Sequence, residues 1–254
     1  YGKGLAITVE DLQDATFRAE LLVECRDVEL AVKTLGDISD ALASRGLGRE
    51  VVRIGSDLLA ILDWSDKKIT DLPDFGKFIG TLVKVAIAYQ REDVARPVID
   101  KYSKLVAKGT AAYVAWCAIM CYVEWSLRKY EDAIRWGREG VRVKGESDLD
   151  TQSDAAHSLA LALRGSGNVT DALTVFLRGR TVDDILRAEH NDGQTPAATF
   201  GNIGRCLHKE GRVDAALRCY AKSALLLEEA SDVTSIVNRG WAALWIGEVF
   251  LEKG

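Results

Sequence analysis

Apolar and small residues recur at spacings of three and four along most of the chain, as in helices that bury one face. The clearest example reads Phe200-x-x-Ile203-Gly204-x-x-Leu207-x-x-x-Gly211. Few runs of β-branched residues and only three prolines interrupt the pattern. The sequence therefore predicts helices throughout.

The same frame recurs along the sequence, and the small residue that follows its second apolar position marks each copy. This marker falls at Ser39, Val83, Cys121, Ala160, Gly204 and Gly247. Successive steps are 44, 38, 39, 44 and 43 residues, and the copies at positions 83 and 121 are the weaker ones. Six evenly spaced copies predict a chain built from repeated helical units.

Each copy predicts two helices joined by a turn. The first helix ends where Gly46, Gly167 or Gly211 supplies a residue that adopts the left-handed conformation at little cost. The second helix carries a small residue followed by a bulky one, as in Ala216 and Tyr220. The repeating unit is thus a helical hairpin.

The three prolines bear on where helices begin. Thr195 followed by Pro196 predicts an N-cap and a proline in the first helical turn. Pro73 with Asp74 as the cap predicts a second helix start. Pro97 falls inside the expected second helix of its copy, so that helix begins late, is kinked or has a different register.

The order of bulky, apolar, small, turn, alanine and aromatic positions resembles the tetratricopeptide repeat (TPR). The closest matches are KYEDAIRWGREG and GRVDAALRCYAKSALLLEE. The resemblance covers residues 30–254 and implies an all-α, right-handed superhelical solenoid of stacked antiparallel helix hairpins. It implies a single solenoid domain of about five and a half repeats, after an N-terminal leading helix within residues 1–29.

The repeats differ in length from the common form of this family. The mean step is 41.6 residues, whereas the common repeat has about 34, which implies helices about one turn longer. The proline that often closes a repeat is absent. Such long repeats resemble those of sensor domains in bacterial signal-transducing NTPases, and those of scaffold, adaptor and vesicle-fusion adaptor proteins.

Three glycines in a basic stretch, Gly201, Gly204 and Gly211, raise the question of a phosphate-binding loop. Such a loop joins a strand to the start of a helix, and no strand pattern precedes residue 197. A glycine inside a helix costs about 1 kcal/mol relative to alanine, a cost that close packing of two helices explains. The recurrence of small residues at the marker favours packing over phosphate binding.

Composition excludes several classes of partner. Of 254 residues, 48% are hydrophobic, and the net charge of −5 gives no overall basic field for nucleic acid. No apolar run predicts a membrane span, and the start does not resemble a signal peptide.

Five cysteines without a C-x-x-C pair predict reduced, buried thiols and a cytoplasmic or otherwise intracellular location. Because the chain begins with Tyr1 and its single methionine is Met120, we expect a piece of a longer polypeptide.

No group of residues predicts a catalytic centre, a metal site or a cofactor. Cys117 and Cys121 lie one turn apart, but no histidine or further cysteine lies near them in the sequence. His157, His190 and His208 are isolated, and no serine or cysteine has a recognisable base partner. We expect no enzymatic activity in this chain.

The TPR resemblance places candidate binding residues on the first helix of each repeat, which lines the inner groove in that family. These residues are Lys84, Tyr122, Trp125, His157, Leu161, Arg164, Asn202, Arg205, His208 and Lys209, with Trp245 and Glu248 in the sixth copy. The middle of the set is basic and aromatic in an acidic protein, and Asn202 and Arg205 resemble two positions of the family's carboxylate-binding members. One hypothesis is that the groove binds an acidic or carboxylate-bearing peptide or protein segment. The other is a solvated helix face without a ligand.

The last helix carries Trp241 and Trp245 on a shared face. Either a helix beyond residue 254 covers them, or they form an exposed apolar end of the repeat array that binds other surfaces.

Two functions follow from these observations. The first is a non-catalytic protein-interaction module, a scaffold or adaptor within a larger polypeptide, that contacts neither nucleic acid nor the membrane interior. The alternative is the ligand- or protein-sensing domain of a signal-transducing NTPase-type regulator. A Walker-type loop upstream would favour the sensor.

Overall fold

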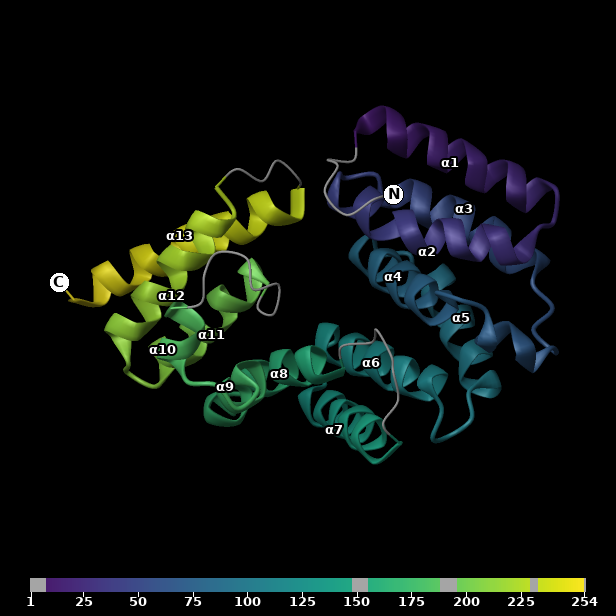
Figure 1. The fold of residues 1–254 in the computed structure, drawn as a ribbon. Coiled ribbons are helices and arrows are strands. Elements are labelled where there is room, and N and C mark those ends of the chain that lie inside the picture. Colours follow the sequence, from purple (N-terminus) through teal and green to yellow (C-terminus); the bar gives the residue numbers. More distant parts are fainter. Residues whose placement is uncertain (1–7, 148–154, 188–195, 229–232, 254) are drawn as a thin grey trace. The chain divides into compact units, whose positions relative to one another are not determined.

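The computed structural model describes residues 8–147, 155–187, 196–228 and 233–253 (Figure 1). Within these ranges the chain is all-α, as predicted. The helices are α1 (Val9–Glu24), α2 (Val28–Ser44), α3 (Gly48–Ile61), the 3-10 helix η1 (Lys67–Asp71), α4 (Phe75–Ala88), α5 (Glu92–Leu105), α6 (Ala111–Ser126), α7 (Tyr130–Ser147), α8 (Ala155–Gly165), α9 (Val169–Leu177), α10 (Val182–Arg187), α11 (Ala197–Lys209), α12 (Val213–Leu226) and α13 (Val233–Lys253).

The chain divides into two compact units. Unit 1 contains residues 1–119 and 140–153, and unit 2 contains residues 120–139 and 154–254. In unit 1, α2 packs against α1, α3 and α4, while α4 packs against α3 and α5. Fully buried side chains fill this unit, among them Leu35, Phe75, Phe78, Leu82 and Tyr102. Burying each such side chain contributes about 1.5–3 kcal/mol.

Unit 2 is built in the same way from the hairpins α8–α9 and α11–α12, with α13 packed against α12 and α11. Its core draws residues from each of these helices, among them Leu163, Phe176, Ile203, Tyr220 and Val249. The apolar positions of the repeating frame thus lie inside, which is the arrangement that the hydrophobic pattern predicts.

In each of the five repeat copies whose turn is described, the turn contains one residue with a positive φ, at Gly46, Gln90, Arg128, Gly167 and Gly211. Each lies seven positions after the frame's marker. At Gly211 the turn is closed by two backbone bonds of 2.9 Å, and the turn at Gln90 is closed by the corresponding pair. The predicted turn glycines are therefore confirmed, and the two weaker copies form the same turn with a non-glycine residue.

The predicted helix starts are correct in position but differ in mechanism. α4 begins at Phe75, but Asp74 has a φ of 63° and its side chain caps nothing. Pro196 occupies the N-cap position of α11 rather than its first turn, and Thr195 lies outside the described residues. α5 begins at Glu92 and continues through Pro97, so the late start is excluded. Pro97 is exposed, where a carbonyl that lacks its helical donor is open to water.

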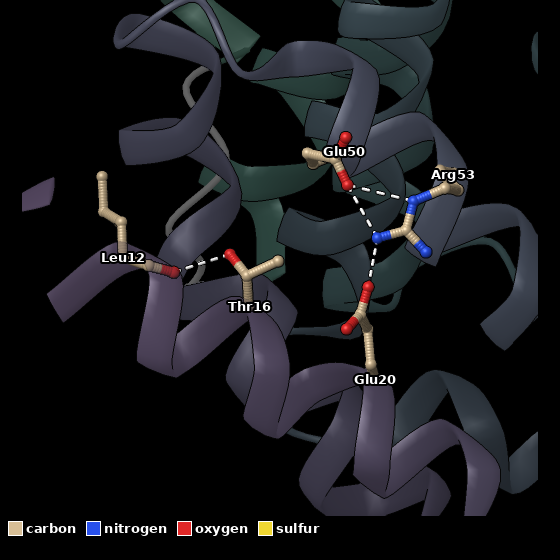
Figure 2. A network of polar contacts seen from close by, with 5 residues as sticks. All are labelled: Leu12, Thr16, Glu20, Glu50 and Arg53. Atoms are coloured by element: carbon tan, nitrogen blue, oxygen red, sulfur yellow. Dashed lines mark hydrogen bonds and ion pairs between the residues drawn. The ribbon is translucent and has the colours of Figure 1, made fainter. Parts of the chain in front are cut away.

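The leading helix α1 is held to α3 by a network of polar contacts (Figure 2). Arg53 of α3 donates to Glu50 through Nε at 3.0 Å and through Nη2 at 2.7 Å, and it also donates to Glu20 of α1. These hydrogen bonds raise the pKa of the Arg53 guanidinium. To the left of the network in Figure 2, the Thr16 hydroxyl donates to the Leu12 carbonyl at 2.6 Å within α1. Because the ion pair between Arg53 and Glu20 is partly exposed to water, it contributes little to the free energy of unfolding, and its main effect is on where α1 lies against α3.

Candidate functional site

The glycines of α11 serve helix packing. A Cβ atom at Gly204 would lie 2.6 Å from two ring atoms of Tyr220 and 3.2 Å from the Ala216 carbonyl oxygen. A Cβ atom at Gly201 would lie 3.0 Å from the ring of Trp245. These contacts leave no room for a larger side chain, so α12 and α13 lie against α11 at these two positions. The packing interpretation of Gly204 is confirmed.

Six polar residues form a row that links α8, α11 and α13, which we call the polar row: Arg164, Asn202, Arg205, His208, Glu248 and Glu252. Arg164 of α8 donates to the Asn202 side-chain oxygen, and Arg205 of α11 forms an ion pair with Glu248 of α13. His208 Nε2 lies 2.9 Å from a Glu252 carboxylate oxygen. Four of the sequence-predicted residues, with Glu248, are therefore brought together in unit 2.

The charges of the polar row are unevenly paired. Arg205 and His208 face carboxylates, whereas the hydrogen-bond partner of Arg164 within the described residues is the neutral Asn202 amide. Burial lowers the pKa of the Arg164 guanidinium, and the nearby Arg205 charge lowers it further. Tyr220 lies against this region; no described group meets full hydrogen-bond geometry with its buried hydroxyl, but the Arg205 guanidinium lies close enough to lower the pKa of Tyr220 against the effect of burial. Arg164 is thus a partly desolvated cation whose hydrogen-bond partner in the described part of the chain carries no charge.

Aromatic rings lie beside the polar row. The Arg205 guanidinium lies 6.0 Å from the ring centre of Trp245, and Trp245 contacts Tyr220 at 5.5 Å between ring centres. The His208 ring meets Tyr220 edge-on at 6.4 Å. These rings shield one side of the charged groups from water, which strengthens their electrostatic interactions.

Other predicted residues make contacts elsewhere in the described structure. Tyr122 and Trp125 pack against each other at 5.6 Å on α6, and Trp125 also contacts a small apolar cluster. His157 packs edge-on against Phe176 at 5.7 Å. Leu161 is partly buried against the core of unit 2.

Two of the predicted lysines are exposed. Lys209 lies at the end of α11, next to the polar row in sequence. Lys84 belongs to α4 in unit 1, whereas the polar row belongs to unit 2.

Sequence reasoning missed Glu252. The only signal for it is its spacing, because it lies one turn after Glu248 and one repeat length after His208.

The cysteines are poor nucleophiles where the structure buries them. Burial raises the pKa of the Cys206 thiol to about 11 and that of Cys219 to about 12. Cys117 and Cys121 are buried as well, while Cys25 is exposed and contradicts the prediction that the cysteines are buried. Cys25 follows the last turn of α1, where its amide caps the helix and its side chain faces out. Thiolate chemistry is therefore disfavoured at Cys206 and Cys219.

The described residues contain no group of three or more histidine, cysteine, aspartate or glutamate side chains placed to hold a metal ion. None of the helices in the described ranges combines the length and apolar character needed to cross a membrane.

The comparison with solved structures supports the helical repeat fold described above. No family model matches the chain, and a search of curated proteins found no match. The crystal structure of BtubC (BKLC) from P. vanneervenii is similar with a TM-score of 0.55 at 16% identity, over 85% of this chain and 88% of that one. A candidate kinesin light chain from Podosopora anserina with nearly identical TPR-like repeats gives a TM-score of 0.45 at 12% identity, over 87% and 96% of the two chains. The chain therefore has an all-α, TPR-like helical repeat fold, as its sequence predicts.

Proposed function

We propose that this chain is a protein-interaction module and that the polar row of unit 2 binds an acidic or carboxylate-bearing segment of a protein partner. The TPR-like repeat fold is typical of protein-interaction modules. The alternative, a sensing domain of a signal-transducing regulator, stays a prediction of the sequence.

Arg164 is the observation that carries the proposal. Its guanidinium is partly desolvated, and its hydrogen bond goes to a neutral amide. A buried cation is unfavourable unless an anion and further hydrogen bonds compensate for its lost hydration. A guanidinium offers five N–H donors in a planar fork that matches a carboxylate. A ligand carboxylate at Arg164 would supply the missing negative charge.

Neighbouring groups support a carboxylate at this place. The Asn202 amide accepts from Arg164 through its oxygen, which leaves its NH2 group as a donor of the kind that carboxylates accept. The ion pair between Arg205 and Glu248 shows a carboxylate already bound by the next arginine of the same row. The partner carboxylate would extend this arrangement by one repeat. Charge-assisted hydrogen bonds of this type are about twice as strong as neutral ones.

An array of glutamate-containing peptides, each paired with its glutamine counterpart, tests the proposal. We expect glutamate peptides to bind the protein and their glutamine counterparts to bind more weakly. For the tightest peptide, Arg164→Gln should raise Kd by about tenfold or more, because the charged donor is lost. Arg187→Gln is the matched control, since Arg187 is exposed at the end of α10, and it should leave Kd within about twofold.

The double substitution Arg164→Glu with Arg205→Glu should abolish binding, because it reverses both charges. Equal binding of glutamate and glutamine peptides, or an unchanged Kd in Arg164→Gln, would contradict the proposal. Circular dichroism of each variant establishes that a loss of binding is not a loss of folding.

A further inference from the structure

The two arginines of the polar row have different partners on the next helix along the repeat array. Arg164 of α8 donates to the side-chain oxygen of Asn202 on α11, which is a neutral acceptor. Arg205 of α11 forms an ion pair with Glu248 of α13. Both contacts join the first helix of one repeat to the first helix of the next. The residue opposite each arginine therefore decides whether the arginine charge is balanced within the protein.

Arg205 is a poor place for a second carboxylate. Its charge is already matched by Glu248, so a ligand carboxylate bound there would lie beside a like charge. The frame position one repeat before Arg205 is Leu161, which packs against the core of unit 2 and carries no charge. The contact between His208 and Glu252 places a further carboxylate of α13 next in the row. Carboxylates of the chain itself thus occupy this part of the polar row.

Arg164 lies at the other end of the polar row, next to groups that do not supply an anion. The Cys206 thiol and the Tyr220 phenol are close to its guanidinium and would favour its charge if they were ionised. Burial raises the pKa of Cys206 to about 11 and that of Tyr220 to about 12, so both groups are neutral at pH 7. The hydrogen bond of Arg164 to Asn202 adds no charge either.

We infer that the polar row binds one carboxylate and that Asn202 and Glu248 set this number. Asn202 leaves the charge of Arg164 to the ligand, whereas Glu248 balances the charge of Arg205. The inference rests on the proposed function and adds the class of partner segment, which is one with an isolated acidic residue and not an acidic tract. Asn202 and Glu248 act through the two arginines and so determine specificity.

A carboxylate at position 202 would act on Arg164 as Glu248 acts on Arg205. Aspartate has nearly the same shape as asparagine and places an oxygen where Asn202 already accepts the hydrogen bond from Arg164. The hydrogen bond would become charge-assisted on both sides and hence stronger. A ligand carboxylate would then meet a like charge at both arginines.

Asn202→Asp tests the part of the inference that concerns Arg164. It should raise the Kd of the tightest peptide with one glutamate by about tenfold or more. It should also raise Tm, because a partly desolvated guanidinium gains an anion. Asn202→Ser is the control, since it removes the amide without adding a charge. It should keep the Kd within about fivefold and retain the preference for glutamate over glutamine.

Glu248→Gln tests the part that concerns Arg205. Calorimetric titration compares the one-glutamate peptide with variants whose second glutamate lies one to four positions from the first. The parent protein should bind the two kinds of peptide within about twofold of each other, whereas Glu248→Gln should favour the best two-glutamate peptide by about fivefold or more. Glu131→Gln removes the same charge from an exposed residue in the first turn of α7 and should leave the ratio unchanged.

The outcomes distinguish this inference from the proposed function. A folded parent protein that binds no glutamate peptide would overturn both. If the parent binds glutamate peptides, the inference alone would be overturned by an Asn202→Asp protein with an unchanged Kd or without a raised Tm. A parent that itself prefers two glutamates by about fivefold, or a Glu248→Gln protein with the parent ratio, would overturn it as well. Weaker binding with a raised Tm in Asn202→Asp, together with the changed ratio in Glu248→Gln, would support it.

Discussion

Two helices of unit 2, α11 and α13, carry the same frame of residues but differ in what covers them. Gly204 on α11 is closed by the ring of Tyr220, whereas Gly247 on α13 has open space beside it. Leu207 is buried and Phe250 is exposed at the same frame position. In a repeat protein the exposure of a position therefore depends on the neighbouring helix as much as on the repeat itself.

The largest expected effect separates the covered position from the open one. Tyr220→Ala removes a fully buried ring between α11 and α12 and should lower the free energy of unfolding by about 3–5 kcal/mol. Phe250→Ala removes an exposed ring and should change it by less than about 0.5 kcal/mol. Urea denaturation followed by circular dichroism measures both. Similar losses in the two variants would mean that the two positions do not differ in packing.

The two marker glycines should respond to alanine in opposite directions. Gly204→Ala places a methyl group against the Tyr220 ring and the Ala216 carbonyl, and should destabilise the protein by about 1–3 kcal/mol. Gly247→Ala meets nothing and should stabilise by about 0.5–1 kcal/mol, because alanine favours the helix. Thermal unfolding of both variants checks the signs, and a stabilised Gly204→Ala protein would contradict the close contact.

The last prediction concerns the Tyr220 hydroxyl, whose effect on stability depends on pH. Burial raises the pKa of Tyr220 to about 12, above the value of about 10 expected in the unfolded chain. Because the folded protein binds this proton more tightly, the contribution to stability is complete below pH 10 and is lost as the pH rises toward 12.

Tyr220→Phe should remove this contribution to the alkaline loss of stability and change stability at pH 7 by less than about 1 kcal/mol, since the contact of the hydroxyl with Arg205 does not meet full hydrogen-bond geometry. Denaturation at pH 7 and at pH 11 measures the difference. An equal loss between these pH values in the parent and the variant would assign the loss to other groups.

The sequence predicts the hairpins, their glycine turns and the close contact at Gly204 because these features depend on local periodicity and on side-chain size. It does not predict that Gln90 and Arg128 take the left-handed conformation, because neither residue favours it. In both copies the packing of the two flanking helices fixes the left-handed backbone conformation of the turn, and Gln90 or Arg128 adopts it although it has a side chain.

The candidate site is less predictable than the fold. The TPR resemblance places Arg164, Asn202, Arg205 and His208 on the groove side of the first helices of two successive repeats, but the sequence does not show that Glu248 and Glu252 pair with two of them. That pairing depends on how α13 packs against α11, which is a property of tertiary structure. The sequence also gives no sign that Arg164 is the cation left beside a neutral partner.

The position of the left-handed turn shows which part of the repeat changes in length from one copy to the next. In the five copies whose turn is described, the turn lies seven positions after the marker. A buried residue of the second helix lies five positions after the turn, at 46 and 51, 90 and 95, 128 and 133, 167 and 172, and 211 and 216. The variation among steps of 38 to 44 residues therefore lies between that buried position and the next marker, a stretch that includes the rest of the second helix, and this helix has nine residues in α9 but 18 in α7. The turn and the helix ends beside it are the part of the repeat with a constant length, and residues are added or removed at the far ends of the hairpins and in the segments between them.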